Sequence, residues 1–447
     1  MTQQTDSPTT LRRALGLPST VFFGLAYMVP MTVFTTYGIV TTITGGHLPA
    51  AYVFTLLAML VTALAYANMV KAFPVAGSAY TYTEKSFGPG VGFLAGWALL
   101  LDYLFLPMIN FIVMGLYINA ALPQIPIWGV IVVAIALVTA LNVIGIKIAA
   151  GLNSVLVGIQ ALFVITFAIM SFLTISGRAQ SISPLQPFIS QDFQFTAVAA
   201  GAAILCLSFL GFDAVSTLSE ETKDATRTIP RAIVICTLSA GALFIFIAWV
   251  GHMVFPEWST FLDPDTAGME VAQAAGGAFL ASFFTAAFVA GGLASAVASQ
   301  ASVSRILFSM GRNNLLPPRI FGLLHERFRT PYLATIAVGV VSLLALVVPL
   351  DLASSVISFG ALIAFTVVNL SVIKHYALDQ GQRRGSAALK YVVLPLIGVA
   401  LCLWLWTSLS GVTFAVGLSW AALGFIWLVV VTRAFTRKVP TMDMREV

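Results

Sequence analysis

Two aspartates in otherwise apolar stretches are the first residues of this sequence that could do chemistry. Asp102 lies in WALLLDYLFLPMIN and Asp213 lies in LSFLGFDAVSTLSEE. A carboxylate near the middle of a membrane helix costs about 2.5 to 3.5 kcal/mol to insert, so one that is kept there normally faces the interior and has a partner. No Lys or Arg lies near the middle of the surrounding apolar segments. The missing partner is therefore expected to be a proton or a cationic solute.

Aromatic side chains near the two acids could contribute to binding a cation. Tyr103 follows Asp102, and an aromatic face attracts ammonium groups. Four further side chains flank the two helix interruptions described below and are predicted to close over a solute: Tyr27, Met28, Phe209 and Phe212. The alternative for each aromatic side chain alone is packing. The alternative for each acid alone is a protonated carboxyl, or one that is hydrogen-bonded to freed backbone.

Polar residues after Asp213 recur at helical spacing. Asp213 begins a stripe at i, i+3, i+4 and i+7 that continues with Ser216, Thr217 and Glu220. The stripe points toward the cytoplasmic end, and Glu220 and Glu221 complete the predicted substrate-binding set. Because Glu221 is off the stripe by one residue, a solvated ion pair with Arg227 or Arg231 is its alternative.

The elements that must position these residues are membrane-spanning helices. The chain has 447 residues, 59% of them hydrophobic and 9% charged, with mean hydropathy +0.97. A soluble domain is about one-quarter charged, and apolar runs of about 20 residues span a bilayer as helices. The sequence predicts an all-α integral membrane protein with about twelve spans, near 20–43, 51–69, 90–120, 127–143, 153–175, 197–218, 232–255, 279–308, 332–350, 352–373, 391–409 and 412–431.

The first and sixth spans are interrupted in similar ways. The first carries Gly24 and Pro30 in FFGLAYMVPMTVF, and the sixth carries Gly211 beside a charge. Non-helical backbone at membrane depth survives only where it lines a cavity or is buried in protein. Matched interruptions in corresponding helices of two halves indicate a midplane site in an inverted-repeat transporter. Kinks or close helix packing are the alternative.

This pattern divides a single transporter domain, residues 1–447, into parts. The first five-helix repeat covers about 18–177 and the second about 196–373, and two trailing helices cover about 391–432. Small residues in the eighth span (GGLASAVASQASVS) favour close packing, although Ser299 and Gln300 could also face a pathway. The tails, 1–17 and 433–447, are short.

The positions of Lys and Arg along the sequence predict how the chain is oriented in the membrane. Of the 22 Lys and Arg residues, Arg178 alone falls on the side of the odd-numbered loops. This is the positive-inside distribution of an even-spanning protein with both termini cytoplasmic, so the pI of about 9.2 needs no nucleic acid to explain it. The first 18 residues lack the pattern of a cleaved signal peptide.

Other site classes find no support in the sequence. The three cysteines all fall inside predicted spans, which suggests neither a disulfide framework nor a metal site. The four histidines are scattered in or near loops without triad or ligand spacing, so neither catalysis, a metal nor a cofactor is expected.

Several motifs resemble those of one transporter family along the whole chain. PVAGSAYTY, FLGFDAVSTLSEETKDATRTIPRAI and RILFSMGRNNLLP resemble the amino acid, polyamine and organocation transporters, and GLAYMVPMTVF and LLDYLFLPMIN are similar to bacterial putrescine importers. The resemblance implies a LeuT-like five-plus-five inverted repeat with substrate between broken spans one and six and spans three and eight. It places Asp102 and Tyr103 at substrate, Asp213 at a common acidic position, and Glu220 and Glu221 at an acidic pair.

Two departures from the family pattern bear on the substrate. Amino acid transporters of the family usually have a break in span one rich in Gly, Ser or Thr, whose amides hold the substrate carboxylate; here the stretch is AYMVPMTV. A carboxylate would be poorly received there. Gln160 stands where some relatives carry a lysine that is thought to replace a sodium ion, so the resemblance does not assign the proton-coupling group. Asp213 or Asp102 is the candidate for that role.

Together these features predict an importer of a small organic cation in the bacterial inner membrane. Putrescine or a related amine is the expected substrate, with the proton gradient or the membrane potential as the driving force. An exchanger of amines or amino acids is the nearest alternative. A receptor that binds an amine without moving it is a weaker one, because the termini carry no signalling domain.

Overall fold

A computed structural model describes residues 15–74, 78–144, 147–177, 183–220, 222–312, 315–328, 330–437 and 439. Within these ranges the chain is nearly all helical, and its only β pairing is an isolated bridge between Leu15 and Thr222. The predicted all-α class is confirmed.

The first half of the chain forms eight α-helices and three 3-10 helices: α1 (Leu17–Tyr27), η1 (Pro30–Phe34), α2 (Tyr37–Ile43), α3 (Leu48–Ala72), α4 (Ser78–Phe87), α5 (Pro89–Ala121), α6 (Ile127–Ile144), α7 (Lys147–Ser176), α8 (Phe195–Ile204), η2 (Leu205–Phe209) and η3 (Ala214–Glu220). The second half contains α9 (Ala225–Val254), η4 (Trp258–Thr260), α10 (Ala267–Arg312), α11 (Pro318–Phe321), α12 (Tyr332–Ser342), η5 (Leu343–Leu346), α13 (Leu350–Val372), η6 (Ile373–Asp379), α14 (Ser386–Ala388), η7 (Leu389–Val393), α15 (Leu394–Thr407) and α16 (Gly411–Val431).

Many of these helices are long and apolar enough to cross a membrane. The described residues contain 10 such helices, or 11 if the bent pair Phe195–Ile204 and Cys206–Ser219 counts as one span. The segment Tyr332–Leu346, in the ninth predicted span, is a shorter apolar helix. The protein is therefore a multi-pass membrane protein, because lipid-facing backbone must satisfy its own hydrogen bonds.

One face of α7 exposes a row of large apolar side chains. Leu162, Ile165, Ile169 and Leu173 are each more than half exposed, at 57%, 57%, 57% and 67%, and they recur along one side of the helix. A contiguous apolar surface of this kind is avoided on soluble monomers. We interpret it as a surface that contacts lipid.

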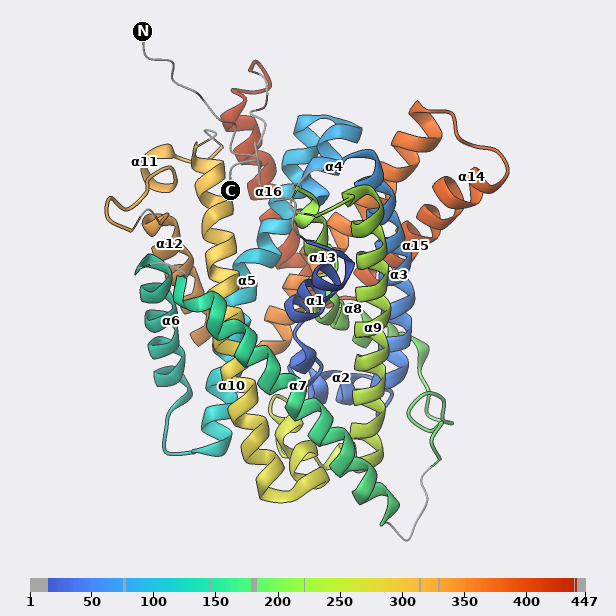
Figure 1. The fold of residues 1–447 in the computed structure, drawn as a ribbon, viewed down its shortest axis with the longest axis vertical. Coiled ribbons are helices and arrows are strands. Elements are labelled where there is room, and N and C mark those ends of the chain that lie inside the picture. The colour runs from blue at the N-terminus through green and yellow to red at the C-terminus, as the bar shows by residue number, and fades with distance from the viewer. Residues whose placement is uncertain are drawn as a thin grey trace.

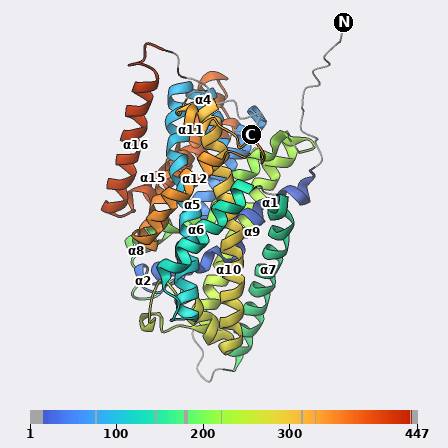
Figure 2. The same ribbon diagram turned by 90° about the vertical axis from the view of Figure 1, so that its left-hand side faces the viewer.

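In the view of Figure 1 the interrupted helices α1 and α8 lie in the middle of the ribbon, whereas the turned view of Figure 2 shows α8 toward the α16 side and α1 toward the α7 side. Figure 2 shows α16 at one edge of the bundle and α7 at the opposite edge. The helix α15 packs against α13 and α3, and α16 packs against α5 and α13. The two trailing helices therefore pack on the outside of the bundle.

The interruption of the first span lies at Met28 and Val29, between α1 and η1. Val29 has φ +52°, which is unusual for a β-branched residue, and Pro30 begins η1. Gly24 lies inside α1, where a Cβ atom would come within 2.6 Å of the Cys236 Sγ of α9. The predicted break at Gly24 is thus wrong: this glycine allows close packing of α1 on α9.

The sixth span is divided into α8, η2, a turn and η3, with a bend of 43°. Gly211 lies in the turn with φ +125°, a conformation that favours glycine. A Cβ atom on Gly211 would come within 2.7 Å of Tyr27 Cδ1 and 3.0 Å of Met28 Cγ. The two interruptions therefore contact each other at the centre of the protein.

The polar stripe predicted after Asp213 is wrong because η3 is a 3-10 helix, which has three residues per turn. The hydroxyl of Ser216 donates to the Asp213 carbonyl oxygen (2.6 Å) and that of Thr217 to the Ala214 carbonyl oxygen (2.6 Å). Ser216 is buried and Thr217 is exposed. These hydroxyl groups bond within their own helix and do not form one face.

The stretch PVAGSAYTY lies between the second and third predicted spans, yet part of it is helical. From Ser78 onward it belongs to α4, most of which is buried against α5 and α13. In the eighth span, α10 begins at Ala267 and has non-helical φ/ψ angles at Gly276 and Gly277, before the predicted start.

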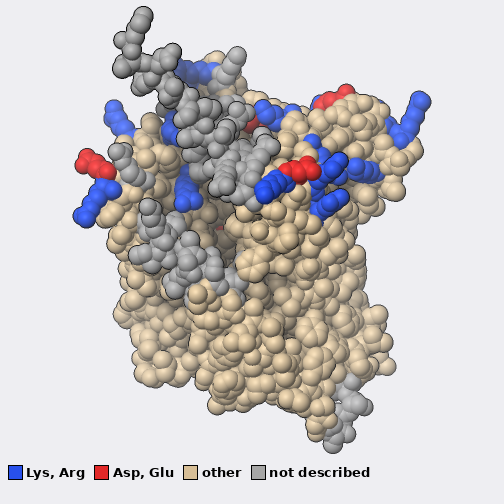
Figure 3. All heavy atoms as spheres, in the orientation of Figure 1, with Lys and Arg blue, Asp and Glu red and all other residues tan. Residues whose placement is uncertain are grey.

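Lys and Arg side chains gather at one end of the face drawn in Figure 3. On the face drawn in Figure 3, Lys and Arg lie at the upper end, where Figure 1 places α4, α11 and α14. The lower half of that face is apolar or uncharged. This asymmetry follows the Lys and Arg distribution along the sequence.

Candidate functional site

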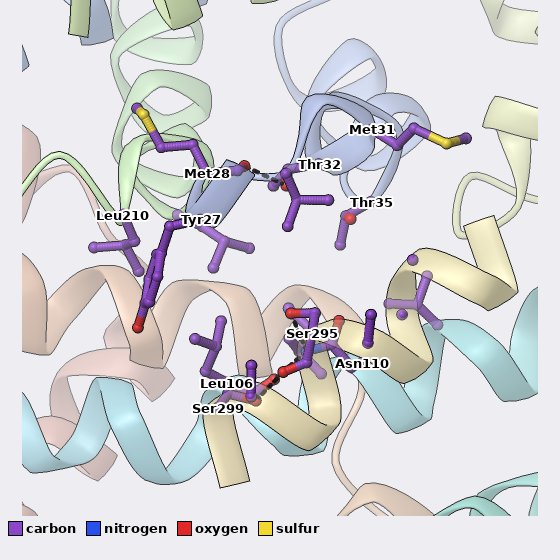
Figure 4. Close-up of a pocket in the computed structure, with 18 of the residues that line it drawn as sticks. Tyr27, Met28, Met31, Thr32, Thr35, Leu106, Asn110, Leu210, Ser295 and Ser299 are labelled. Carbon is purple, nitrogen blue, oxygen red and sulfur yellow. Dashed lines mark hydrogen bonds between the residues drawn. The ribbon is translucent and has the colours of Figure 1, made fainter. Parts of the chain in front are cut away.

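A cavity of about 360 Å³ lies beside the interruption of the first span (Figure 4). Its walls come from α1 and η1, from α5, α7 and α10, and from the turn after η2. The side chains that line it include Tyr27, Met28, Thr32, Leu106, Asn110, Gln160, Leu210, Ser295, Ser299 and Arg305.

Small polar groups line the α5 and α10 side of this cavity. The Asn110 Nδ2 donates to Ser295 Oγ (3.0 Å) and to the Leu106 carbonyl oxygen (2.9 Å). The Ser299 hydroxyl donates to the Ser295 carbonyl oxygen (2.6 Å). Figure 4 shows Asn110, Ser295 and Ser299 across the cavity from Tyr27 and Met28. Hydrogen bonds therefore fix the orientation of this polar wall.

Gln160 of α7 adds an unsatisfied acceptor. Its side chain is 1% exposed and lines the cavity beside Gly291, where a Cβ atom would come within 2.6 Å of the amide. Among the described residues its Oε1 atom has no hydrogen-bond partner. A buried acceptor of this kind is costly unless it is paired, so Gln160 could accept a hydrogen bond from an ammonium group in the cavity.

The two aspartates lie behind the wall of the cavity. Neither lines it, and Asp102 and Asp213 are 5% and 6% exposed. Leu106, one helical turn after Asp102, and Leu210, three residues before Asp213, both do line it. The prediction that both acids face a chamber is therefore not met by this conformation, in which they lie next to the cavity.

The acids form one electrostatic cluster with two tyrosines. Asp102, Asp213, Tyr27 and Tyr103 all lie within electrostatic range of one another. Of these four side chains, Tyr27 lines the cavity. We refer to them below as the acidic cluster.

No described Lys or Arg side chain compensates the two carboxylates of the acidic cluster. The Gly211 backbone N–H donates to Asp213 Oδ1 (3.2 Å), whereas Asp102 Oδ1 has no hydrogen-bond partner among the described residues. Neither aspartate forms an ion pair with a described Lys or Arg. An acid buried in this way needs a proton or a cation.

Two predicted binding residues lie in the protein core. Phe209 packs edge-on against Phe244 with ring centroids 5.5 Å apart, and Phe212 packs against Tyr66 and Phe365 at 5.6 and 5.2 Å. Both are 0% exposed and neither lines the cavity. Both side chains therefore pack in the core in this structure and do not close over a solute, which was the alternative prediction for each.

The other predicted site residues differ in whether they reach the cavity. Tyr27 and Met28 line the cavity, and Tyr103 is half-buried. The side chain of Glu220 and the whole of Glu221 lie outside the described residues. Ser299 lines the cavity, but Gln300 is buried in an amide network with Asn142 and Thr139. Sequence reasoning missed Thr32 and Ser295, although a hydroxyl just after the Pro30 interruption was an available signal.

The two ends of the cavity differ. At one end it is lined by Arg305, toward the end of α10 that carries Arg312. Toward the other end, Phe34 packs edge-on against Phe163, Phe167 and Phe284 with ring centroids 5.2 to 5.9 Å apart. Tyr117 donates a hydrogen bond to the Phe34 carbonyl oxygen (3.0 Å). These aromatic side chains are buried and do not line the cavity, so they form a packed cluster behind the wall that Met31 and Thr35 contribute.

We expect Phe34→Ala to destabilise this aromatic cluster. Removing a fully packed Phe costs about 3 to 5 kcal/mol of unfolding free energy in protein cores, so the melting temperature of the purified protein should fall clearly. Phe279→Ala is the matched control, because Phe279 lies on α10 and is 65% exposed. Equal melting temperatures for the two variants would show that the packing of Phe34 in this cluster does not stabilise the protein.

The described residues contain no group of three or more His, Cys, Asp or Glu that could hold a metal ion.

Comparison with known proteins places the chain in a family. The sequence model of the amino acid permease family matches residues 19–446. The low-affinity putrescine importer PlaP of Escherichia coli strain K12 is 42% identical over 439 residues, which cover 97% of this chain and 96% of that protein. The branched-chain amino acid permease BcaP of Bacillus subtilis strain 168 is 28% identical, covering 94% and 93%, and the methylthioribose transporter of the same strain is 28% identical, covering 93% and 92%.

The family match extends over nearly the whole chain, and the importer of E. coli is similar over nearly its whole length. The interrupted first and sixth spans agree with that assignment. The chain therefore belongs to the amino acid permease family, within the amino acid, polyamine and organocation transporters that its motifs resemble.

Proposed function

We propose that this protein imports a small organic cation, putrescine or a related amine, across the bacterial inner membrane. The observation that carries the proposal is the acidic cluster: two buried carboxylates beside a cavity, without an ion pair from the described residues. The similarity to a putrescine importer supports the same substrate class. The end rich in Lys and Arg faces the cytoplasm in this proposal.

The proposed binding mode uses the cluster and the polar wall together. Asp102 and Asp213 neutralise the ammonium groups, and Tyr103 and Tyr27 contribute aromatic faces. Gln160 accepts a hydrogen bond from an ammonium group that extends into the cavity. Tyr27 forms part of the cavity wall, and the two acids lie behind that wall. In this proposal the Tyr27 side chain therefore moves aside when a cation passes from the cavity to the acids.

The backbone at the first interruption favours an amine over an amino acid as the proposed substrate, because it offers few N–H groups to a carboxylate. The backbone there carries Met28, Val29 and Pro30, and proline has no N–H to donate to a carboxylate. The buried acids would also repel a carboxylate.

The interruptions act as hinges in this proposal. Val29 with its positive φ and Gly211 contribute the non-helical backbone between rigid helical halves. Glu220 and Glu221 follow on the cytoplasmic side, where they would attract the departing cation.

The membrane potential is sufficient to drive accumulation. Moving one charge through 100 mV yields about 2.3 kcal/mol, hence roughly twice that for a diamine dication. Proton coupling through Asp102 or Asp213 is the second possible source of energy, since one of two neighbouring buried acids readily holds a proton.

Uptake into proteoliposomes tests the proposal. Vesicles that contain no amine, with a potassium diffusion potential that is negative inside, should accumulate labelled putrescine at least about tenfold above vesicles without a potential. An obligate exchanger would need internal amine or amino acid, and a receptor would show saturable binding without accumulation. Either outcome would replace the proposed import mechanism.

A further inference from the structure

A second cavity lies away from the acidic cluster, at the end of the molecule rich in Lys and Arg. It is a groove of about 440 Å³ with α3 and α9 as two walls and the segment from η7 into α15 as the third. Its lining residues are Leu64, Ala67, Asn68, Lys71, Thr226, Arg227, Pro230, Arg231, Val234, Ile235, Lys390 and Leu394. We call this cavity the basic groove.

Each wall of the basic groove changes from cationic to aliphatic along its length. On α3, Lys71 lies in the last turn and Leu64 two turns earlier. On α9, Arg227 and Arg231 lie near the start and are followed on the same face by Val234 and Ile235. The third wall repeats the order, with Lys390 before Leu394. The groove thus has a cationic end and an apolar end.

The cations of the groove are only weakly compensated. None of the described residues that line it is acidic. Arg227 Nε lies 3.8 Å from Asp224 Oδ2, but both side chains are exposed, so this pair contributes little. Lys390 Nζ donates to the Tyr391 hydroxyl (2.9 Å), which carries no formal charge. Lys71, Arg231 and Lys390 therefore have no ion pair with a described acidic residue, and the exposed pair of Arg227 leaves most of its charge to an anion.

The apolar end opens toward lipid. Ile235 is 39% exposed on a helix that is apolar enough to span the membrane. In Figure 3, Lys and Arg side chains gather on this face at the upper right, where Figure 1 places α3, α9 and α15. A ligand in the groove could therefore contact the cations and the hydrocarbon of the bilayer at once.

We propose that the basic groove binds the headgroup of an anionic phospholipid, with its acyl chains along Val234, Ile235 and Leu394. Basic pockets between transmembrane helices on the cytoplasmic side have the charge to hold phosphate headgroups. A free phosphate would meet the same cations but would leave the aliphatic half of the groove unfilled. The lipid would link α3, α9 and α15 at the membrane surface.

Native mass spectrometry of the purified full-length protein tests this site. The probes are phosphatidylglycerol, zwitterionic phosphatidylcholine and inorganic phosphate. Wild type should retain phosphatidylglycerol in preference to phosphatidylcholine, and millimolar phosphate should not displace it. The double variant Lys71→Gln and Arg231→Gln should retain phosphatidylglycerol about tenfold less, because each basic side chain near the surface contributes to binding.

A control variant separates the groove from general surface charge. Arg319→Gln with Arg437→Gln removes the same charge from exposed positions outside the groove and should bind phosphatidylglycerol like wild type. As a second readout, phosphatidylglycerol should raise the melting temperature of wild type and of this control but not of the groove variant.

The following outcomes would overturn the proposal. Equal lipid binding by the groove variant would remove these residues from any lipid site. Equal loss in the control would assign the effect to net charge. Displacement by inorganic phosphate would make the ligand a free anion instead of a lipid.

Discussion

Replacing Asp102 with asparagine is expected to lower putrescine uptake about a hundredfold, with little change in the amount of folded protein. The substitution keeps the shape of the side chain and removes the charge that would pair with an ammonium group. Removing one partner of a buried charge pair costs about 2 to 5 kcal/mol, and 2.7 kcal/mol corresponds to a factor of about one hundred. Initial rates of labelled putrescine uptake into energised proteoliposomes measure the effect.

Asp192→Asn is the matched control for this substitution, because Asp192 is exposed and lies outside the cavity. Size-exclusion chromatography of the solubilised variants reports whether each is folded. Asp102 does not belong to the binding site if Asp102→Asn transports at the wild-type rate.

The substitution Gly211→Ala is expected to reduce uptake at least about tenfold and to lower the melting temperature. Gly211 has φ +125°, and a residue held in an unfavourable backbone region costs about 1 to 3 kcal/mol. The new Cβ atom would also lie 2.7 Å from Tyr27 Cδ1 and 3.2 Å from the Met28 backbone nitrogen. The contact between the two interruptions would then have to open.

Gly277→Ala separates the contact from the backbone strain. Gly277 also has a positive φ, +63°, but a Cβ atom there would meet nothing within 4 Å. We expect this variant to lose some stability and to keep its transport rate. Similar losses of uptake in the two variants would mean that backbone strain alone, and not the junction with Tyr27, explains the effect.

The sequence was sufficient to predict most of the long apolar helices, because length and hydrophobicity decide them. The described residues contain 10 or 11 membrane-length helices where about twelve spans were predicted, and the ninth predicted span is a shorter helix. The predicted span 90–120 and the helix Pro89–Ala121 differ by one residue at each end. A long apolar segment must form its own hydrogen bonds in lipid, so its helical state does not depend on tertiary contacts. The same reasoning predicted that the first and sixth spans are interrupted.

The exact point of the first interruption could not be predicted from composition. Gly24 and Pro30 are both helix-weakening residues, yet Gly24 packs against Cys236 within α1 while the backbone departs from helix at Val29. Whether a glycine breaks a helix or allows close packing depends on the neighbouring helix, which the local sequence does not contain. The 3-10 geometry of η3 is a tertiary feature of the same kind.

The site was predicted in its chemistry more than in its geometry. The buried acids Asp102 and Asp213 were found because charge in an apolar segment is conspicuous, and the structure brings them into one cluster. Which aromatic side chains face a cavity depends on how helices rotate against each other. For that reason Tyr27 lines the cavity, whereas Phe209 and Phe212 are core residues.

Equilibrium binding of labelled putrescine to the purified protein, with three four-carbon competitors, tests most directly whether the acidic cluster holds a cation. The competitors are 1-aminobutane, 1,4-butanediol and 4-aminobutanoate. If the buried carboxylates hold the substrate, the monoamine competes more weakly than putrescine itself, and neither the neutral diol nor the carboxylate-bearing compound competes measurably. Displacement by the diol or by 4-aminobutanoate as effective as that by putrescine would contradict the account.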